Sequence, residues 1–528
     1  MNVLNRSISF AVCVALLDAS ADAQTPTSAI RTVAIAGDTA PGTQRGTVFR
    51  DFGNAALNDE GHVAFRGRMA GPGTSENRSW GAWSEGGGTL HLLAQVSRLA
   101  PGGGIFSDNI VTPQLDNLGR SFFWADVAGG TLYSEQNGTV TRVAGPGMQA
   151  AGAAPGVTYR PIWAGDPTFS INDLGQYVFA TTLSGPGVVD GNRHGLWLGT
   201  GTSHQLLVRA GDPAPGTEAG TFFITSRSDF FAHTPTLNPS GVVAFAGMVN
   251  GQNVPSTGRQ GVWVGSPGNL SLAIRSGTQT PGGAAGSHIN DFSIPAINDA
   301  GDVAIIAGIS GSGANNDRGI YALRDGALTK VVREGDPAPG GGVYTTVASL
   351  LLNGNGDIAF YGTFGAGDGM WKERNRVIEP VSLPSDQAPG GAVGERLTSI
   401  DEPVFNDYGQ VAFMAGTSMG RTGIWAEDLG GVLRKIIVEG DVIEYRPGLL
   451  GTVTEVGSDA LLGFAGSHDG RASGFNAAGQ IAFRAEVDGR PGIFVSSLVL
   501  VPEPASFLMG AIAVMLGLLA HRFKRFPC

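Results

Sequence analysis

The sequence predicts an all-β protein, a β-propeller of about eight four-stranded blades. The first observation is a motif, N-x-x-G-x-x-A-F, that recurs eight times at spacings of 53 to 70 residues. Self-similarity at such a period indicates a solenoid or propeller. The second observation is that the two ends of the repeat region are complementary in phase. The eight copies are Asn58–Phe65, Asp116–Phe123, Asn172–Phe179, Asn238–Phe245, Asn298–Ile305, Asn353–Phe360, Asn406–Phe413 and Asn476–Phe483.

The composition agrees with short strands joined by tight turns. The 528 residues are 42% hydrophobic and 15% charged, with 83 Gly and 29 Pro, and enough large apolar side chains to argue against disorder. A net charge of -11 argues against nucleic-acid binding, which needs a basic surface. The only cysteines, Cys13 and Cys528, lie near the ends. Disulfides and thiolate metal sites are therefore excluded from the repeat region.

Four extended runs make up one repeat. In the first copy we expect strands over 48–57, 62–69, 81–84 and 89–96. The turn Asn58–Gly61 suits a type I geometry, with Asn first and Gly fourth. After the turn, Val63, Ala64 and Phe65 are all apolar, so we expect both faces of this strand to be buried. A small Ala on one face lets successive sheets nest closely, as in a propeller.

The ends of the repeat region predict a closed ring. Residues 30–35 precede Gly37-Asp38 as the fourth strand of a repeat does, while the last copy stops after its third strand, near Gly492-Ile-Phe. The first strand can therefore complete the last blade, which removes both exposed edges. We thus expect the propeller over residues 24–499, with short helical segments at both termini.

Residues 1–23 have the features of a secretory signal peptide. Arg6 is basic, an apolar run follows from Ile8 to Leu17, and Ala21-Asp-Ala23 is an A-x-A cleavage pattern. A buried N-terminal helix is the alternative.

Residues 500–528 resemble the PEP-CTERM sorting signal. Pro502-Glu-Pro504 is followed by an apolar run from Ala505 to Ala520 and then by a basic tail, an order that suits a transmembrane helix with a cytoplasmic end. The motif residues are Pro502, Glu503, Pro504, Arg522, Lys524 and Arg525. The resemblance implies an exosortase-type partner, membrane association before processing, and delivery to the cell envelope, surface or exterior. A plain tail anchor is the alternative.

The repeat region itself resembles the tandem-repeat family named for N-x-x-G-x-x-A-F, over about residues 30–497. Its further marks are a G-x-aromatic run, as in Gly81-Ala-Trp83, and a G-D-x-x-P-G connector, as in 37–42. The resemblance implies a surface-destined protein of unknown biochemical role and brings no catalytic residues. Asp116 and Ile305 are departures from the motif.

Two sets of carboxylates are candidates for calcium. Asp59 and its counterparts follow the motif Asn, but the spacing of a calcium loop is missing, so turn formation is the simpler interpretation. The connector aspartates would share one face of the ring; each is also suited to accept backbone N–H bonds in its own turn. They are Asp38, Asp212, Asp336, Asp386 and Asp441. No cofactor or metal is therefore predicted, and calcium stays an unsupported option.

Aromatic residues off the repeat pattern are the candidate binding residues. Five tryptophans hold the repeat position and are predicted to be core, whereas Trp80, Trp124 and Trp163 do not and could stack on sugars or pack at an edge. Two repeats have long insertions before the motif, 216–238 and 448–476. The first could bind a partner, plug the channel or extend a strand. The predicted binding residues are Phe222, Phe223, Phe230, Phe231, His233 and Trp163.

Catalytic motifs are missing from the sequence. It has no G-x-S-x-G, H-E-x-x-H or Walker A pattern, and its histidines lack metal-ligand spacing. The preferred hypothesis is a non-catalytic, surface-sorted protein that binds extracellular polysaccharide or protein. The alternatives are a polysaccharide-active hydrolase or lyase on the same scaffold, built from carboxylates of different blades, and a purely structural envelope component.

Overall fold

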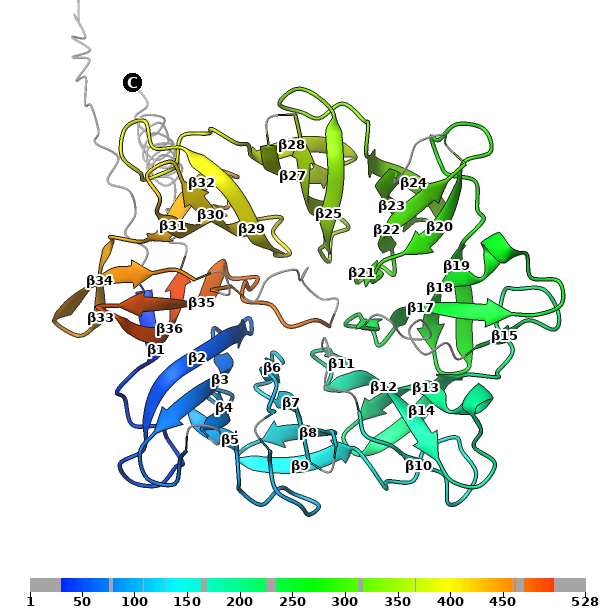
Figure 1. The fold of residues 1–528 in the computed structure, drawn as a ribbon, viewed down its shortest axis with the longest axis horizontal. Coiled ribbons are helices and arrows are strands. Elements are labelled where there is room, and N and C mark those ends of the chain that lie inside the picture. Colours follow the sequence, from blue (N-terminus) through cyan, green and yellow to red (C-terminus); the bar gives the residue numbers. More distant parts are fainter. Residues whose placement is uncertain are drawn as a thin grey trace, which may run out of the picture. The chain divides into compact units, whose positions relative to one another are not determined.

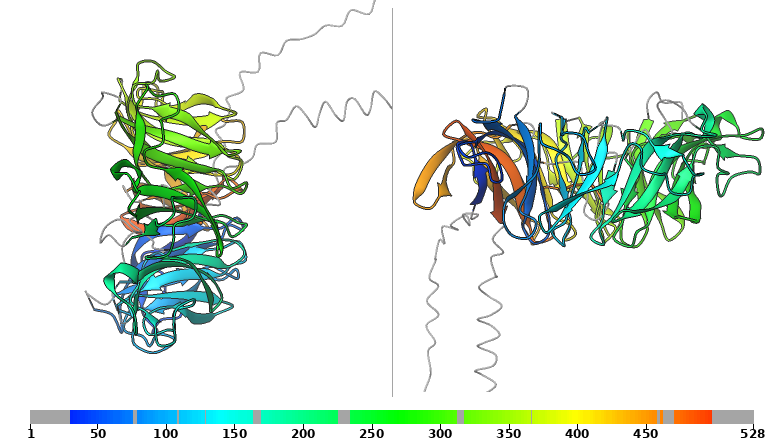
Figure 2. Two further views of the ribbon diagram at one scale, coloured as in Figure 1. Left: turned by 90° about the vertical axis from the view of Figure 1, so that its right-hand side faces the viewer. Right: turned by 90° about the horizontal axis from the view of Figure 1, so that it is seen from below.

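The computed structural model describes residues 30–75, 79–107, 109–127, 129–162, 169–224, 234–311, 317–365, 367–457, 460–461 and 470–497. Residues Ala29–Leu500 form one compact unit. Its described strands make eight antiparallel sheets around a common centre (Figure 1), and side views show the sheets standing side by side in one ring (Figure 2). The predicted eight-bladed propeller is confirmed. The predicted terminal helices lie outside the described residues.

The first four blades follow one another along the chain. Blade 1 contains β2 (Val48–Leu57), β3 (Val63–Ala70), β4 (Trp80–Ser84) and β5 (His91–Gln95), and blade 2 contains β6 (Gln114–Leu115), β7 (Ser121–Ala125), β8 (Thr131–Gln136) and β9 (Thr139–Ala144). Blade 3 contains β10 (Thr158–Tyr159), β11 (Phe169–Ile171), β12 (Gln176–Ser184), β13 (His194–Thr200) and β14 (Ser203–Arg209). Blade 4 contains β15 (Phe222–Phe223), β16 (Thr236–Leu237), β17 (Val243–Asn250), β18 (Gln260–Ser266) and β19 (Asn269–Arg275).

The remaining blades complete the ring. Blade 5 contains β20 (His288–Phe292), β21 (Ala296–Ile297), β22 (Val303–Ser310), β23 (Asp317–Arg324) and β24 (Ala327–Arg333), and blade 6 contains β25 (Tyr344–Leu352), β26 (Ile358–Phe364), β27 (Gly367–Arg374) and β28 (Val377–Ser382). Blade 7 contains β29 (Leu397–Phe405), β30 (Val411–Thr417), β31 (Thr422–Glu427) and β32 (Leu433–Val438). Blade 8 contains β33 (Val442–Arg446), β34 (Leu449–Glu455), β35 (Gln480–Val487), β36 (Arg490–Ser497) and β1 (Ile30–Ile35). Two single-turn 3-10 helices, η1 (Asp190–Asn192) and η2 (Ser256–Gly258), lie in loops of blades 3 and 4.

The first strand of the chain closes the last blade. β1 pairs antiparallel with β36, from Ile30 opposite Ser496 to Ile35 opposite Gly492. Arg31 of β1 also reaches onto blade 1, where its guanidinium donates to Glu85 at 2.7 Å and to the carbonyl of Gly61 at 2.9 Å. The predicted closure by strand exchange is therefore confirmed.

Antiparallel strands place alternate turns at opposite ends of each blade. The turns that carry the repeat motif, between the first and second strands, thus share one face of the ring, which we call the motif face. The connectors between blades share the other face, which we call the connector face. The short strands before the motif turns, such as β6, β11 and β21, lie next to the middle of the ring (Figure 1).

The core lies between neighbouring blades. The motif Phe of one blade packs in a buried cluster with the motif Ala of the preceding blade, as Phe65 does with Ala482 and Phe413 with Ala359. A larger side chain at the Ala position would fill the space that the Phe ring occupies. Close nesting of sheets through this Ala–Phe pair is what the sequence predicts.

The repeat tryptophan contacts both the motif phenylalanine and the connector of its blade. Phe65 stands opposite Trp83 on β4, and the two rings are stacked with centroids 6.1 Å apart. Trp83 Nε1 donates to the carbonyl of Pro41 in the connector at 3.1 Å. The same bond joins Trp263 to Pro215, Trp371 to Pro339 and Trp425 to Pro389. The predicted core position of the repeat tryptophans is confirmed, since all five are fully buried.

Candidate functional site at the centre of the motif face

The motif asparagine first shapes its own turn. Gly61 N–H donates to the carbonyl of Asn58 at 3.0 Å, and His62 N–H donates to Asn58 Oδ1 at 2.8 Å. Gly61 has a φ of 79°, which glycine adopts without strain. A Cβ at Gly61 would also lie 2.7 Å from the Gln480 side chain of blade 8. The glycine thus serves both the turn and the close approach of the neighbouring blade.

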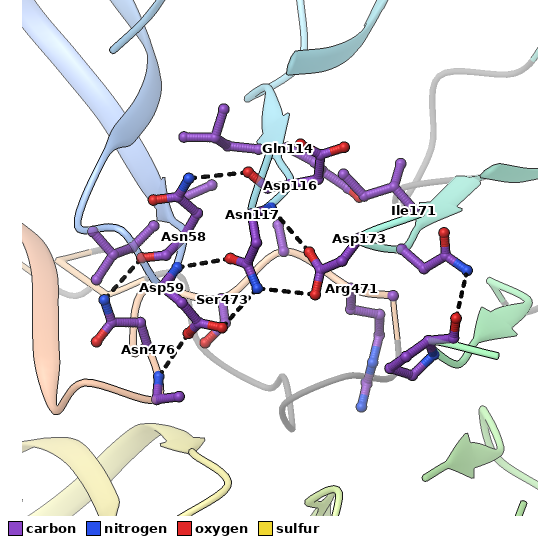
Figure 3. A pocket seen from close by; sticks show the side chains of 18 of the residues that line it. Asn58, Asp59, Gln114, Asp116, Asn117, Ile171, Asp173, Arg471, Ser473 and Asn476 are labelled. Atoms are coloured by element: carbon purple, nitrogen blue, oxygen red, sulfur yellow. Dashed lines mark hydrogen bonds between the residues drawn. The ribbon is translucent and has the colours of Figure 1, made fainter. Parts of the chain in front are cut away.

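The same asparagine also joins its blade to the next. Asn58 Nδ2 donates to the main-chain carbonyl of Asp116 at 3.0 Å, and Asn476 Nδ2 donates to that of Asn58 at 2.8 Å (Figure 3). Among the described residues, the further links of this kind are Asn172 to Asn238, Asn238 to Asn298, Asn353 to Asn406 and Asn406 to Asn476. The motif asparagines therefore form a nearly continuous chain of hydrogen bonds around the ring.

Arginines bridge the two remaining junctions. In blade 2 the motif residue is Asp116, which cannot donate, and Arg120 binds its carboxylate at 2.6 Å and donates across to the carbonyl of Asp173 at 3.1 Å. Burial raises the pKa of Asp116, and its bonds to Arg120 oppose this. Between blades 5 and 6, Arg324 donates to the carbonyl of Gly356 at 2.9 Å and pairs with buried Glu373.

The second residue of the motif turn forms another set of links. Asn117 Nδ2 donates to Asp59 Oδ2 at 2.6 Å and to Asp173 Oδ2 at 2.9 Å (Figure 3). The main-chain N–H of Asn117 donates to Asp173 Oδ1 at 2.9 Å, and that of Ala477 donates to Asp59 Oδ1 at 2.9 Å. Two carboxylates from different blades are thus held on one neutral amide.

These residues line a pocket at the middle of the motif face, which we call the central pocket. It has a volume of about 700 Å³, including space open to solvent, and its lining comes from blades 1, 2, 3, 4, 7 and 8. Gln114 lines it, is 3% exposed, and donates through Nε2 to the carbonyl of Phe169 at 3.5 Å. Gln114 Oε1 has no hydrogen-bond partner among the described residues. The pocket thus contains a buried acceptor without a donor.

The third residue of each motif turn points outward on the same face. Leu118 and Leu174, on neighbouring blades 2 and 3, are 68% and 59% exposed, and Tyr408 of blade 7 is 62% exposed. Each follows directly after a residue that lines the central pocket, namely Asn117, Asp173 and Asp407. Exposed apolar side chains therefore adjoin a polar pocket.

The insertion of blade 8 crosses the middle of the ring. Its Ser473 carbonyl accepts from Leu57 N–H of blade 1 at 2.9 Å, and its Gly470 carbonyl accepts from Ile171 N–H of blade 3 at 2.9 Å. A Cβ at Gly470 would lie 2.8 Å from the carbonyl of Leu237 in blade 4. The long insertion over 448–476 therefore contributes Gly470 and Ser473 to the lining of the central pocket.

Two of the predicted binding residues of the first insertion, Phe222 and Phe223, are described by the structure, and they differ in burial. Phe222 is 44% exposed on β15, whereas Phe223 is 1% exposed and packs edge-on against Trp263 with centroids 4.7 Å apart. Phe223 thus occupies the core position that Phe49 holds against Trp83 in blade 1. The other four predicted residues, Phe230, Phe231, His233 and Trp163, lie outside the described residues.

The other off-pattern tryptophans pack against the protein. Trp124 is buried and donates to the carbonyl of Ile162 at 2.9 Å. Trp80 is partly exposed, and the guanidinium of Arg66 lies 4.4 Å from its ring centre. The structure thus shows edge packing for Trp80, beside Arg66 and Arg68, and burial for Trp124.

The connector aspartates cap their own turns. Asp212 Oδ2 accepts from Arg209 N–H at 2.8 Å and Asp336 Oδ2 from Arg333 N–H at 2.9 Å, and the same bond occurs at Asp38, Asp386 and Asp441. This agrees with the turn interpretation of the sequence. In the part of the chain that the structure describes, no group of three or more His, Cys, Asp or Glu residues is arranged to hold a metal ion.

The predicted terminal signals, with Ala21, Ala23 and the Pro502–Pro504 segment, lie outside the described residues. Within the described ranges, no helix is long and apolar enough to cross a membrane.

A family model, described as a family of unknown function, DUF7453, matches residues 15–368 and 342–508. The chain belongs to this family. No curated protein matches this DUF7453 chain in sequence. The matched residues include the whole repeat region that forms the propeller.

Solved structures with a similar fold include three propeller-containing proteins. An oligogalacturonate lyase in complex with manganese is 12% identical, with a TM-score of 0.39, over 76% of this chain and 97% of that one. The β-propeller domain of the Trilobed protease from Pyrococcus furiosus is 10% identical, with a TM-score of 0.36, over 74% and 98%. A puromycin-hydrolyzing peptidase from Mycobacterium tuberculosis is 11% identical, with a TM-score of 0.38, over 78% and 56%. At these scores the likenesses carry no argument about activity.

The sequence did not point to the residues of the central pocket as a group. Asp59, Asn117 and Asp173 hold the second motif position, where the sequence indicates only turns. A usable signal is that this position is polar in blades 1, 2 and 3 in succession, whereas it is Pro239, Gly354 and Ala477 in three other blades. Gln114 lies two residues before the motif and has no sequence mark.

Proposed function

We propose that this DUF7453 chain is an exported, surface-delivered propeller that acts by binding an extracellular polysaccharide or protein. Export is supported by the A-x-A pattern at Ala21-Asp-Ala23 after an apolar run. Sorting by an exosortase-type enzyme is supported by the resemblance of residues 500–528 to PEP-CTERM. The membrane association then lasts only until the C-terminal segment is processed.

The observation that carries the binding proposal is the composition of the central pocket. Its polar groups, among them Asp59 and Asp173, are fixed by bonds between blades, and exposed Leu118 and Leu174 adjoin it. Binding sites commonly combine a few fixed polar groups with apolar contact surface. A purely structural envelope component has no need of such a pocket, so the pocket argues against that alternative.

The hydrogen bonds of the pocket favour binding over catalysis. The carboxylates of Asp59 and Asp173 accept from main-chain and amide N–H groups, and Asp116 is paired with Arg120. These bonds connect one blade to the next, so the groups already have a structural role. A rigid, preorganised polar surface lowers the entropic cost of binding.

A glycan array tests this proposal with the body of the protein, residues 24–500, which includes all the strands of the closed ring. Selective binding of a polysaccharide class, with or without calcium, is the expected result. An array of extracellular proteins provides the protein arm of the same test. If neither array shows a ligand for a body that unfolds cooperatively, the binding proposal is wrong.

One observation favours the second candidate, a polysaccharide-active hydrolase or lyase. Asp59 Oδ2 and Asp173 Oδ2 lie 2.6 and 2.9 Å from one nitrogen, so the two oxygens are less than about 6 Å apart, a spacing of the order that glycoside hydrolysis uses. The test is to incubate the body with polysaccharides and measure reducing ends and unsaturated products. Product formation that Asp173→Asn abolishes would establish the enzyme in place of the binding protein.

A further inference from the structure

We propose that the central pocket binds the amino-sugar part of an oligosaccharide, taking a positively charged amino group and a hydroxyl of the same ligand. This inference rests on the proposed function and specifies its site and ligand class. Three independent features of the pocket lead to it.

The first feature is an excess of negative charge, because four aspartates line the pocket (Asp59, Asp116, Asp173 and Asp407) against one arginine, Arg471. The carboxylates of Asp59 and Asp173 are held at one nitrogen of Asn117, and each remaining partner in this group is a main-chain N–H. None of these partners carries a charge, so the bonds fix the two carboxylates without neutralising them. Two close carboxylates attract a cation, and a ligand ammonium satisfies both. Their positions on different blades hold them in place for such a ligand.

The second feature is the buried acceptor of Gln114. Its Oε1 atom is unpartnered among the described residues although the side chain is 3% exposed and lines the pocket. A buried acceptor without a donor is unfavourable, so a donor is expected to fill the position. A sugar hydroxyl supplies one. Ser170 and Thr236 occupy the corresponding positions of blades 3 and 4, and the hydroxyl of each donates to a carbonyl of the next blade. These side chains have no amide oxygen, so the unpartnered acceptor is specific to Gln114.

The third feature is the adjoining apolar surface. Leu118 and Leu174 follow directly after Asn117 and Asp173 and are largely exposed. A pyranose ring has an apolar C–H face beside its polar edge, so it can contact the leucines while its amino and hydroxyl groups reach the pocket. An isolated metal ion would leave this surface unused, and an acidic sugar would be repelled by the carboxylates.

The test is calorimetric titration of the body, residues 24–500, with three oligosaccharides of equal length. They are a glucosamine oligomer with free amino groups, its N-acetylated form, and an oligogalacturonate. We expect the glucosamine oligomer to bind at least ten-fold more tightly than the N-acetylated form, and the oligogalacturonate not to bind. Affinity for the glucosamine oligomer should fall as salt is raised, because charges are screened. Equal binding of all three, or no binding of the glucosamine oligomer, would overturn the proposal.

Two variants locate the site. Gln114→Met removes the acceptor at nearly constant volume, and Leu174→Ser removes apolar surface from an exposed position; each should weaken binding at least five-fold. Leu99→Ser is the matched control, because Leu99 is 82% exposed in a connector between blades 1 and 2. Equal unfolding midpoints for the four proteins show that the fold is intact. Unchanged affinity in both Gln114→Met and Leu174→Ser would overturn the assignment.

The outcomes also separate this proposal from the broader one. A different glycan that binds the wild type and both pocket variants equally would leave the proposed function standing and refute the site. A body that binds no glycan and no protein refutes both.

Discussion

The contribution of the motif asparagines to stability can be tested by replacing the Asn–Gln pair of blade 3 with the Asp–Arg pair of blade 2. Blade 2 has Asp116 with Arg120 four residues later, and blade 3 has Asn172 with Gln176 at the same spacing. Asn172 Nδ2 donates to the Asn238 carbonyl at 3.0 Å and to Gln176 Oε1 at 2.9 Å. We expect Asn172→Asp alone to be strongly destabilising, because it removes this donor and buries a carboxylate with no cation.

The magnitude follows from burial. Asn172 is buried, and a buried charge left without a partner lowers the free energy of unfolding by about 3–5 kcal/mol. Adding Gln176→Arg supplies the cation, as Arg120 does in blade 2. Gln176 lies against Gly241 as Arg120 lies against Gly175, so the glycine of the next motif turn stands beside this position at both junctions. We expect the double variant to recover a coupling free energy of about 2–3 kcal/mol.

The assay is equilibrium unfolding of residues 24–500 in guanidinium at neutral pH, followed by tryptophan fluorescence and circular dichroism. Asn375→Asp is the control, since Asn375 is exposed in a hairpin turn, and it should change stability by less than about 0.5 kcal/mol. If Asn172→Asp is as stable as the wild type, or the double variant is no more stable than the single one, the reasoning is refuted.

Three further predictions concern the core and the closure. Burial lowers the pKa of His204, which lies between the hydroxyls of Tyr159 and Tyr177. Because the unfolded chain then binds a proton more readily than the folded chain, the stability of the fold should decrease as the pH drops from about 7 to 5. Thermal unfolding at each pH should show a smaller decrease for His204→Gln. Trp263→Ala should lower the free energy of unfolding by about 3–5 kcal/mol, whereas Trp80→Ala, at a partly exposed site, should cost less than about 2 kcal/mol by the same denaturation assay. Deleting residues 24–36 removes β1 and leaves β36 as an open edge, so sedimentation velocity should show association that the intact body lacks.

The fold could be predicted from the sequence because the repeat is visible in local patterns. Strand alternation and the N-x-x-G turn are properties of a few consecutive residues, and the predicted strand over 48–57 agrees with β2 (Val48–Leu57). The pairing of Ala with Phe follows from residue size and does not require knowledge of the partner. The closure of the ring could be predicted because the repeat region begins with a fourth strand and ends with a third strand.

The central pocket could not be predicted, because it is made by contacts between blades. The Nδ2 atom of Asn58 meets its partner 58 residues away, and a turn-forming Asn gives no local sign of that second bond. The departure of Asp116 from the motif was visible in the sequence, but its compensation by Arg120 depends on the position of the Asp173 carbonyl. The position of Phe223 shows the same limit: its neighbours in sequence indicate an irregular insertion, whereas packing against Trp263 places it in the regular core.

The pairing of β1 with β36 also affects the order in which the fold can form. Ile30 and Ser496 are neighbours in the finished ring, so the first strand to be synthesised must remain unpaired until almost the last one has been made. Contacts between such distant residues form slowly, because a long loop has to close first. A chain of this design therefore cannot close its ring until β36 (Arg490–Ser497) has been made, so ring closure comes late in the formation of the fold.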